Sequence, residues 1–168
     1  NIMGLAFSFG EGMQVAAVAL IGQSLGENRA ELAKLYGKIC RQMGMFTALV
    51  LSFVYFLVGE SLYRMFFVEE NIINMGIQII RLIIVVVILQ IAQVIYMGSL
   101  RAAGDVKFTT AASTISVTII RPIASYLLCY SLGFGIIGIW LGVLLDQLSR
   151  FILTAWRFKQ GKWMKMKI

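Results

Sequence analysis

The sequence predicts an all-α fold, a polytopic bundle of transmembrane helices. Of its 168 residues, 60% are hydrophobic and 14% are charged, and its mean hydropathy of +0.86 is far too high for a soluble domain. Strand-like alternation is absent, and a helix satisfies its own backbone hydrogen bonds in lipid, so helices are favoured over a β-barrel. Five apolar stretches can each cross about 30 Å of hydrocarbon as a helix. They cover roughly residues 3–23, 43–66, 76–100, 108–131 and 136–156.

The first span, residues 3–23, carries a carboxylate, Glu11, near its middle. A charge at mid-membrane costs about 2.5–3.5 kcal/mol on insertion scales, so by default it faces protein or water and is a functional candidate. Flanking glycines favour a local break or a close approach, and Met13 adds a soft wall that suits varied hydrophobic ligands. Two interpretations stay open. Glu11 either binds an ion or substrate with Gln14 beside it, or is a hydrogen-bonded glutamate packed against another helix.

The connection after the first span predicts a short amphipathic helix on the membrane surface. Asn28 and Glu31 have the spacing of a capping box, and apolar residues then recur at helical spacing with charges opposite. The same residues also fit an ordinary basic flank of the second span, residues 43–66.

Polar residues follow one face of the third span and one face of the fourth. Gln90 and Gln93 share a face of residues 76–100. In residues 108–131 the polar positions advance by helical steps and comprise Thr110, Thr114, Thr118, Arg121 and Ser125. Pro122 cannot donate a hydrogen bond to the Thr118 carbonyl, so we expect a kink there. Each polar face either lines a wet cavity or hydrogen-bonds a neighbouring helix.

The fifth span, residues 136–156, holds Asp146 near its middle. Asp146 and Arg121 lie equally far from the turn between the last two spans, so both sit at about the same depth and can form an ion pair. Arg150, one turn along the same helix, is a rival partner for Asp146. A structural charge pair and a direct role in transport both stay open. Two glycine pairs have the small-x-x-x-small spacing that predicts close helix packing: Gly22 with Gly26, and Gly138 with Gly142.

The charges between the spans predict orientation, because short cytoplasmic loops collect Lys and Arg. Eleven of the fifteen basic residues fall in the first connection, the third connection and the tail, residues 157–168. They are Arg29, Lys34, Lys38, Arg41, Arg101, Lys107, Arg157, Lys159, Lys162, Lys165 and Lys167. We therefore expect a multi-pass protein of the inner or plasma membrane, with a cytoplasmic C-terminus and the Asn1 end on the outer side. The basic tail suits anionic membrane lipid.

Composition excludes several function classes. The chain has no His, so imidazole-based catalysis and the usual zinc sites are excluded, and it has no Walker-type loop for ATP. We predict no enzyme activity, no catalytic residue, no metal site and no cofactor. The net charge of +7 reflects membrane topology rather than binding to nucleic acid. The odd number of spans and the start at Asn1 lead us to expect a piece of a longer protein.

Three stretches carry a family resemblance: "ALIGQSLGENRAELAKLYG", "MGSLRAAGDVKF" and "GIIGIWLG…RFKQGKW". Together they resemble the C-terminal half of a multidrug and toxic compound extrusion (MATE) transporter. The most specific signals are the G-Q-x-L-G run at residues 22–26 and the G-x-L-R-x-x-G-D run at residues 98–105. The resemblance covers essentially the whole chain and implies helices eight to twelve of a twelve-helix, two-lobe transporter. It implies that residues 1–168 form the C-terminal lobe without its first helix, partnered by a missing N-terminal lobe.

The resemblance implies secondary active efflux of organic cations or other amphiphilic small molecules by alternating access, coupled to protons or sodium. Members that couple through this lobe resemble one another in an acidic residue on the tenth helix, at a place that corresponds to the neutral Gln90. A partner acid on the seventh helix lies upstream of Asn1. Glu11 is the candidate substitute, and the other binding candidates are Gln14, Gln90, Gln93, Arg121 and Asp146. Met13, Thr114, Thr118 and Ser125 are the cavity-lining candidates.

Two further hypotheses belong to other classes. A lipid-linked oligosaccharide flippase shares the broad two-lobe design, but a large cationic cavity facing an anionic pyrophosphate would favour it, and here only Arg121 and Arg81 are available. A non-transporting structural membrane subunit is also compatible with the composition, but it leaves the polar stripe of the fourth span without a use.

Overall fold

The structure, a computed structural model, describes residues 2–161 and 163. In these residues the regular elements are helical, so the all-α fold class is confirmed. The helices are α1 (Ile2–Gly26), α2 (Ala30–Phe66), α3 (Glu70–Ala102), α4 (Val106–Ile115), α5 (Arg121–Tyr126) and α6 (Gly135–Lys159). Two π-helical turns, η1 (Ser116–Ile120) and η2 (Leu127–Ser131), continue the path of α4 and α5. Residues 106–131 are therefore one continuous helical rod.

Within the described residues, four helical segments are long and apolar enough to cross a membrane: α2, α3, the rod Val106–Ser131, and α6. They correspond to four of the five predicted spans, and α1 occupies the position of the other. At 1.5 Å per residue the 37 residues of α2 measure about 55 Å, against about 30 Å of hydrocarbon. The ends of α2 therefore project beyond the apolar layer.

Two predictions for the start of α2 are wrong. The expected amphipathic surface helix is not separate, because α2 runs unbroken from Ala30 to Phe66. The capping box is also absent, since the residue that precedes α2 is Arg29 and no side chain caps the helix. Asn28 instead adopts a left-handed conformation, with a φ of 58°, and the Arg29 amide donates to the Ser24 carbonyl at 2.8 Å. Asn28 thus closes the end of α1.

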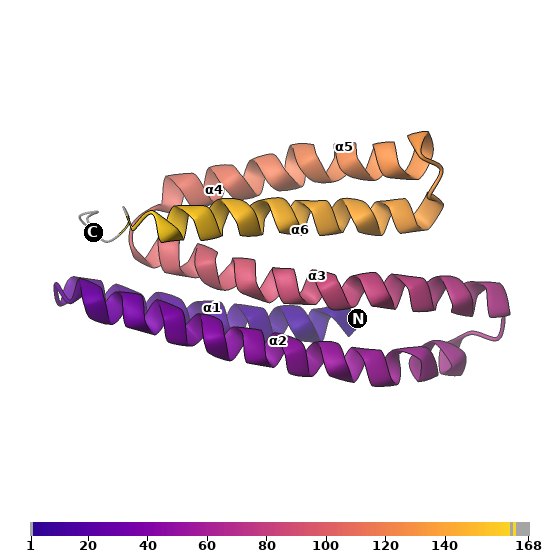
Figure 1. The fold of residues 1–168 in the computed structure, drawn as a ribbon, viewed down its shortest axis with the longest axis horizontal. Coiled ribbons are helices and arrows are strands. Elements are labelled where there is room, and N and C mark those ends of the chain that lie inside the picture. Colours follow the sequence, from indigo (N-terminus) through magenta and orange to yellow (C-terminus); the bar gives the residue numbers. More distant parts are fainter. Residues whose placement is uncertain (1, 162, 164–168) are drawn as a thin grey trace.

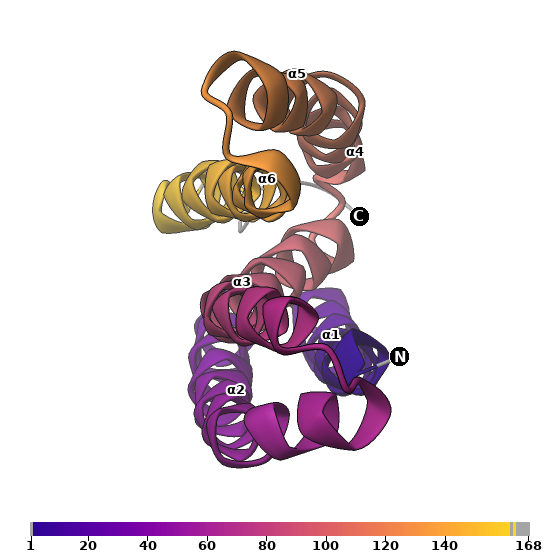
Figure 2. The same cartoon turned by 90° about the vertical axis from the view of Figure 1, so that its right-hand side faces the viewer.

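The helices alternate in direction and α3 is central. The α1–α2 turn, the α3–α4 connection and the C-terminal end of α6 lie at one end of the molecule, and the other two connections lie at the opposite end (Figure 1). Seen end-on, α1, α2 and α3 form one group, and the rod of α4 and α5 pairs with α6 on the far side of α3 (Figure 2). The predicted clustering of basic connections at a common end is therefore confirmed for the described residues. Lys162, Lys165 and Lys167 lie outside them.

Close helix contacts occur where small residues permit them. A Cβ added at Gly138 would lie 2.6 Å from the Cys129 backbone nitrogen, and one at Gly142 would lie 2.8 Å from the Ser125 backbone. The packing prediction is confirmed for this pair. At Gly22 and Gly26 no described atom of another helix comes within 4 Å of an added Cβ, so the same prediction finds no contact there.

Candidate intramembrane polar site

A cluster of polar side chains lies around the middle of α6, which packs against both α3 and η1. Its centre is Asp146, whose side chain is fully buried. Its members are Gln90, Ser116, Asp146, Gln147, Ser149 and Arg150. Gln93, one turn along α3 from Gln90, is also buried. Because the hydrocarbon layer offers no water to compensate buried polar groups, each member needs a partner within the protein or a hydrated cavity.

Asp146 is satisfied by two strong contacts. Arg150 Nη2 donates to Asp146 Oδ2 at 2.6 Å, and Ser116 Oγ donates to Asp146 Oδ1 at 2.6 Å. Ser149 Oγ lies 2.9 Å from Ser116 Oγ and extends the network. The carboxylate charge is therefore offset by a guanidinium one helical turn away, in a buried site where an unpaired charge would be very costly.

The alternative ion pair between Asp146 and Arg121 does not form. Arg121 is exposed, and it makes no ion pair with any residue that the structure describes. Equal distance from the turn sets two residues at one depth, but it does not fix the direction in which each helix presents its side chain. In the rod of residues 106–131 the buried side holds Ser116, and Arg121 lies on the exposed side.

The amide groups of the cluster are only partly satisfied. Gln147 Nε2 donates a hydrogen bond to Gln90 Oε1, which joins α6 to α3. Four buried polar side-chain atoms have no hydrogen-bond partner among the described residues: Gln93 Oε1, Gln147 Oε1, Arg150 Nε and, away from this cluster, Gln160 Oε1. An unsatisfied buried polar group costs about 1–3 kcal/mol. The cluster therefore has a capacity for water or for a polar ligand.

Sequence reasoning missed Ser116, Gln147 and Ser149. A signal for them was present, because Thr109, Ser113 and Ser116 advance by four and three residues along a second face of the same helix. That face is the buried one: Thr109 and Ser116 are fully buried. The adjacency of Asp146 and Gln147 also marks two neighbouring polar positions on α6.

The polar stripe of the fourth span is exposed in this chain. Thr110, Thr114 and Thr118 are exposed and make no side-chain hydrogen bond to any described residue, and Arg121 shares their side of the rod. Ser125 is half-buried, and its Oγ donates to the Ile139 carbonyl at 3.4 Å. Among the residues of this stripe, all of which the structure describes, only Ser125 forms a hydrogen bond to a neighbouring helix. Cavity lining by Thr114 and Thr118 stays a prediction.

The kink at Pro122 stays a prediction, but the backbone before Pro122 forms a widened, π-helical turn. Pro122 follows η1, and the Arg121 amide donates to the Ser116 carbonyl, five residues earlier. Pro122 has no amide hydrogen to donate, so the ladder cannot continue regularly through it. Such π-helical turns are frequent at functional sites, and this one contains Ser116 of the polar cluster.

Glu11 is exposed and unpaired. No side chain that the structure describes forms a hydrogen bond or an ion pair with it. Gln14, one turn on, is half-buried against α3, where a Cβ added at Gly98 would lie 2.6 Å from Gln14 Cγ. The packed interpretation of Glu11 is therefore not realised within the described residues.

Met13 lines a cavity beside α1. The cavity measures about 440 Å³, and it is lined by Ser8, Phe9, Gly12, Met13 and Thr47. Its wall is almost entirely apolar, apart from two hydroxyl groups. Among the described residues, no group of three His, Cys, Asp or Glu side chains is placed to hold a metal ion.

The G-x-L-R-x-x-G-D run at residues 98–105 is structural. Gly104 has a φ of 84°, which an L-residue rarely adopts, and the turn that it permits positions Asp105. Arg157 Nε donates to Asp105 Oδ2 at 2.7 Å, and the Arg157 guanidinium lies over the Phe108 ring at 5.1 Å. Asp105 is 5% exposed. Through the contact between Asp105 and Arg157, this run fixes the end of α6 to the α3–α4 connection.

Comparisons with known sequences find a matching family model and several related transporters. The family model MatE matches residues 1–127. The chain is 28% identical over 167 residues to the uncharacterized transporter YisQ of Bacillus subtilis, covering 98% of this chain and 36% of that protein. It is 25% identical over 171 residues to the probable multidrug resistance protein NorM of Thermotoga maritima, covering 100% of this chain and 36% of that protein. The chain therefore spans about a third of the length of these relatives.

Solved structures share the fold. An inward-facing multidrug resistance MATE family transporter of the MOP superfamily matches with a TM-score of 0.84 at 17% identity, covering 90% of this chain and 34% of that one. An outward-facing structure of such a transporter matches with a TM-score of 0.80 at 18% identity, covering 93% and 34%. Together with the family match over residues 1–127, the five-helix arrangement identifies the chain as a member of the MatE family, the MATE transporters.

Proposed function

We propose that the chain is the C-terminal lobe of a secondary transporter that expels organic cations in exchange for protons or sodium ions by alternating access. The observation that carries this proposal is the contrast between two carboxylates at mid-depth. Asp146 is buried and paired with Arg150 at 2.6 Å, whereas Glu11 is exposed and has no partner among the described residues. Glu11 is therefore the carboxylate free to bind a cation.

Exposed charges on the lateral surface of the bundle support the proposal of a water-filled cleft beside Glu11. Glu11 and Arg121 are both exposed near the middle of their helices. Exposure of such a charge to lipid costs about 2.5–3.5 kcal/mol on insertion scales, so each surface faces further protein or water. A second lobe across a water-filled cleft meets this requirement. Transporter binding sites typically lie at this depth, where structural repeats meet.

Gln90 does not substitute for Glu11. It is neutral, and its carbonyl oxygen already accepts a hydrogen bond from Gln147. A cation bound there would gain no charge neutralisation. With Glu11 as the coupling residue, a lobe that has the neutral Gln90 still provides a carboxylate for the coupling ion.

In the proposed cycle, the organic cation and the coupling ion compete for Glu11 as the lobes rock about the cleft. The lobe fold matches inward-facing and outward-facing structures at TM-scores of 0.84 and 0.80, which supports motion of the lobe as a body. One charge crossing 100 mV supplies about 2.3 kcal/mol. That energy biases the cycle toward release on the outer side.

The test is efflux of a fluorescent organic cation from cells that express the full-length protein. Wild type is compared with Glu11→Gln and with Glu31→Gln, which removes the same charge at the exposed start of α2. We expect Glu31→Gln to pump like wild type and Glu11→Gln to lose most efflux at equal membrane level. Equal pumping by all three would refute the role of Glu11. Failure of wild type with every cation tried would favour the flippase hypothesis, for which exposed Arg121 is the supporting feature.

A further inference from the structure

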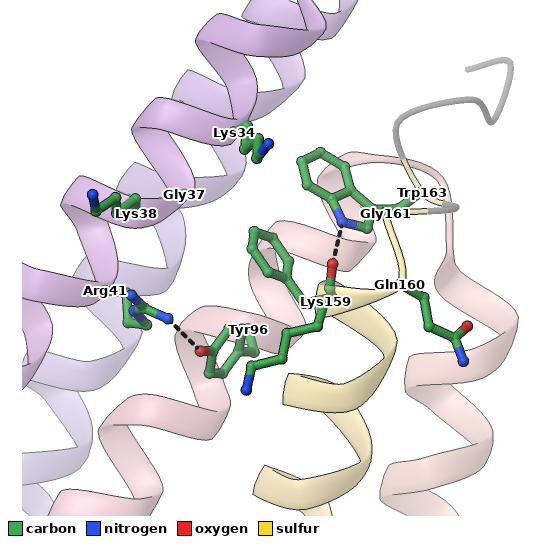
Figure 3. A pocket seen from close by; sticks show the side chains of 10 residues that line it. Lys34, Gly37, Lys38, Arg41, Tyr96, Lys159, Gln160, Gly161 and Trp163 are labelled. Carbon is green, nitrogen blue, oxygen red and sulfur yellow. Dashed lines mark hydrogen bonds between the residues drawn. The ribbon is translucent and has the colours of Figure 1, made fainter.

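A cationic pocket lies at the basic end of the bundle, between α2, α3 and the C-terminal end of α6 with the residues that follow it. Its volume is about 440 Å³. Lys34, Lys38 and Arg41 contribute from α2, and Lys159 contributes from the end of α6 (Figure 3). No carboxylate belongs to its lining. Among the described residues, the pocket therefore gathers four positive charges and no negative charge.

The three pocket lysines have no counter-ion. Lys34, Lys38 and Lys159 are exposed and form no ion pair with any residue in the described ranges. The ion pairs that the structure contains use other acids, such as Asp105 with Arg157 and Glu27 with Arg29. Like charges that line one cavity repel one another, and an anion in the cavity offsets this repulsion.

Aromatic side chains hold the pocket in shape. Arg41 Nη1 donates to the Tyr96 hydroxyl at 2.8 Å, which fixes one cation on the wall. Phe158 stacks on Trp163 with ring centroids 4.8 Å apart, and Trp163 Nε1 donates to the Phe158 carbonyl at 2.9 Å. A Cβ added at Gly37 would lie 2.9 Å from the Phe158 ring. The site is preformed, so a ligand loses little entropy by ordering it.

The depth of the pocket matches the headgroup layer. Arg41 lies just before the apolar part of α2, and Lys34 lies seven residues further out, which is about 10 Å along the helix. The polar layer on each side of a bilayer is about 5–8 Å thick. The cations of the pocket therefore span the level at which lipid phosphates lie.

We propose that this pocket binds a phosphate group, and that its source is the headgroup of an anionic lipid. A row of Lys and Arg at i, i+4 and i+7 on one helix face, joined by Lys159 from a second helix, surrounds an oxyanion from two sides. Basic pockets between transmembrane helices are suited to phosphate-bearing headgroups. The inference is independent of the transported substrate. A soluble phosphorylated molecule offers the same chemistry and is distinguished by the test.

The test is native mass spectrometry of the full-length protein. One titration uses dioleoylphosphatidylglycerol, which is anionic, and another uses dioleoylphosphatidylcholine, which has the same phosphodiester but no net charge. A third uses sn-glycerol 3-phosphate without lipid. The pocket variant is K34Q/K159Q, which removes one cation from each side. The matched control is R101Q/K107Q, which removes two exposed cations from the same end of the bundle but outside the pocket.

We expect phosphatidylglycerol to bind more tightly than phosphatidylcholine, and K34Q/K159Q to weaken phosphatidylglycerol binding about tenfold. The control should change the affinity by less than about twofold, and K34R/K159R, which retains both charges, should bind like wild type. Binding of glycerol 3-phosphate that depends on the pocket, with no lipid preference, would support phosphate recognition but assign the source to a soluble molecule. Equal loss in pocket and control variants, or no loss in either, would overturn the site.

Discussion

The Asp146 carboxylate and the Arg150 guanidinium lie 2.6 Å apart within α6, and the Asp146 side chain is fully buried. Arg150 is 13% exposed, so the pair is almost wholly withdrawn from solvent. Its Asp146 Oδ1 atom accepts a further hydrogen bond from Ser116, which joins α6 to η1. This pair, together with Ser116, therefore holds α6 against the rod of residues 106–131.

Asp146→Asn should destabilise the protein strongly. It leaves the Arg150 charge buried without a counter-ion, and breaking a buried pair in this way costs about 3–5 kcal/mol. D146N/R150Q removes both charges and should recover part of the loss. The measurement is the melting temperature of the full-length protein in detergent. If Asp146→Asn melts like wild type, Asp146 has no structural role.

Gly138→Ala should weaken the contact between α6 and the end of the rod. The added methyl group would lie 2.6 Å from backbone atoms of Leu128 and Cys129, which cannot yield as a flexible side chain does, so a cost of about 1–3 kcal/mol is expected. Gly22→Ala is the matched control, because no described atom of another helix lies within 4 Å of its added Cβ. The control should be neutral or stabilising by up to about 1 kcal/mol, owing to helix propensity. A comparison of the two melting temperatures checks this, and equal shifts would contradict the close approach.

The hydrogen bond between Gln147 and Gln90 should show strong coupling in a double-mutant cycle. Gln90→Leu leaves the Gln147 amide without its acceptor and should cost about 1–3 kcal/mol. Gln147→Leu removes a side chain that already has one unsatisfied atom, and Q90L/Q147L should be more stable than the sum of the single changes indicates. Thermal unfolding of the four proteins gives the coupling energy. Additive losses would mean that the two amides act independently.

The fold was predictable because apolar length and basic connections are local features of the sequence. The helix ends were not, because hydropathy marks only the part of a helix that lies in lipid. Thus α2 begins at Ala30, well before the predicted span at residue 43. Asn28 has the residue type of a cap, but its backbone conformation closes α1 instead.

The candidate site was only partly predictable, for a geometric reason. Counting from a turn gives the depth of Arg121 and Asp146, but rotation about each helix axis depends on packing against the neighbouring helices. The buried side of the rod carries Ser116, whereas the threonine stripe that the sequence made conspicuous lies on the exposed side. The Gln147 contact with Gln90 joins residues 57 positions apart, and no local pattern specifies such a pair.

The most direct test of the central claim is cation transport by the purified full-length protein in proteoliposomes without ATP. A proton gradient or a sodium gradient is imposed separately, and movement of a fluorescent organic cation is followed for wild type, Glu11→Gln and the control Glu31→Gln. We predict that one of the two gradients drives transport by wild type and Glu31→Gln, and that Glu11→Gln responds to neither. Gradient-driven transport by Glu11→Gln at the wild-type rate would show that the coupling carboxylate lies elsewhere.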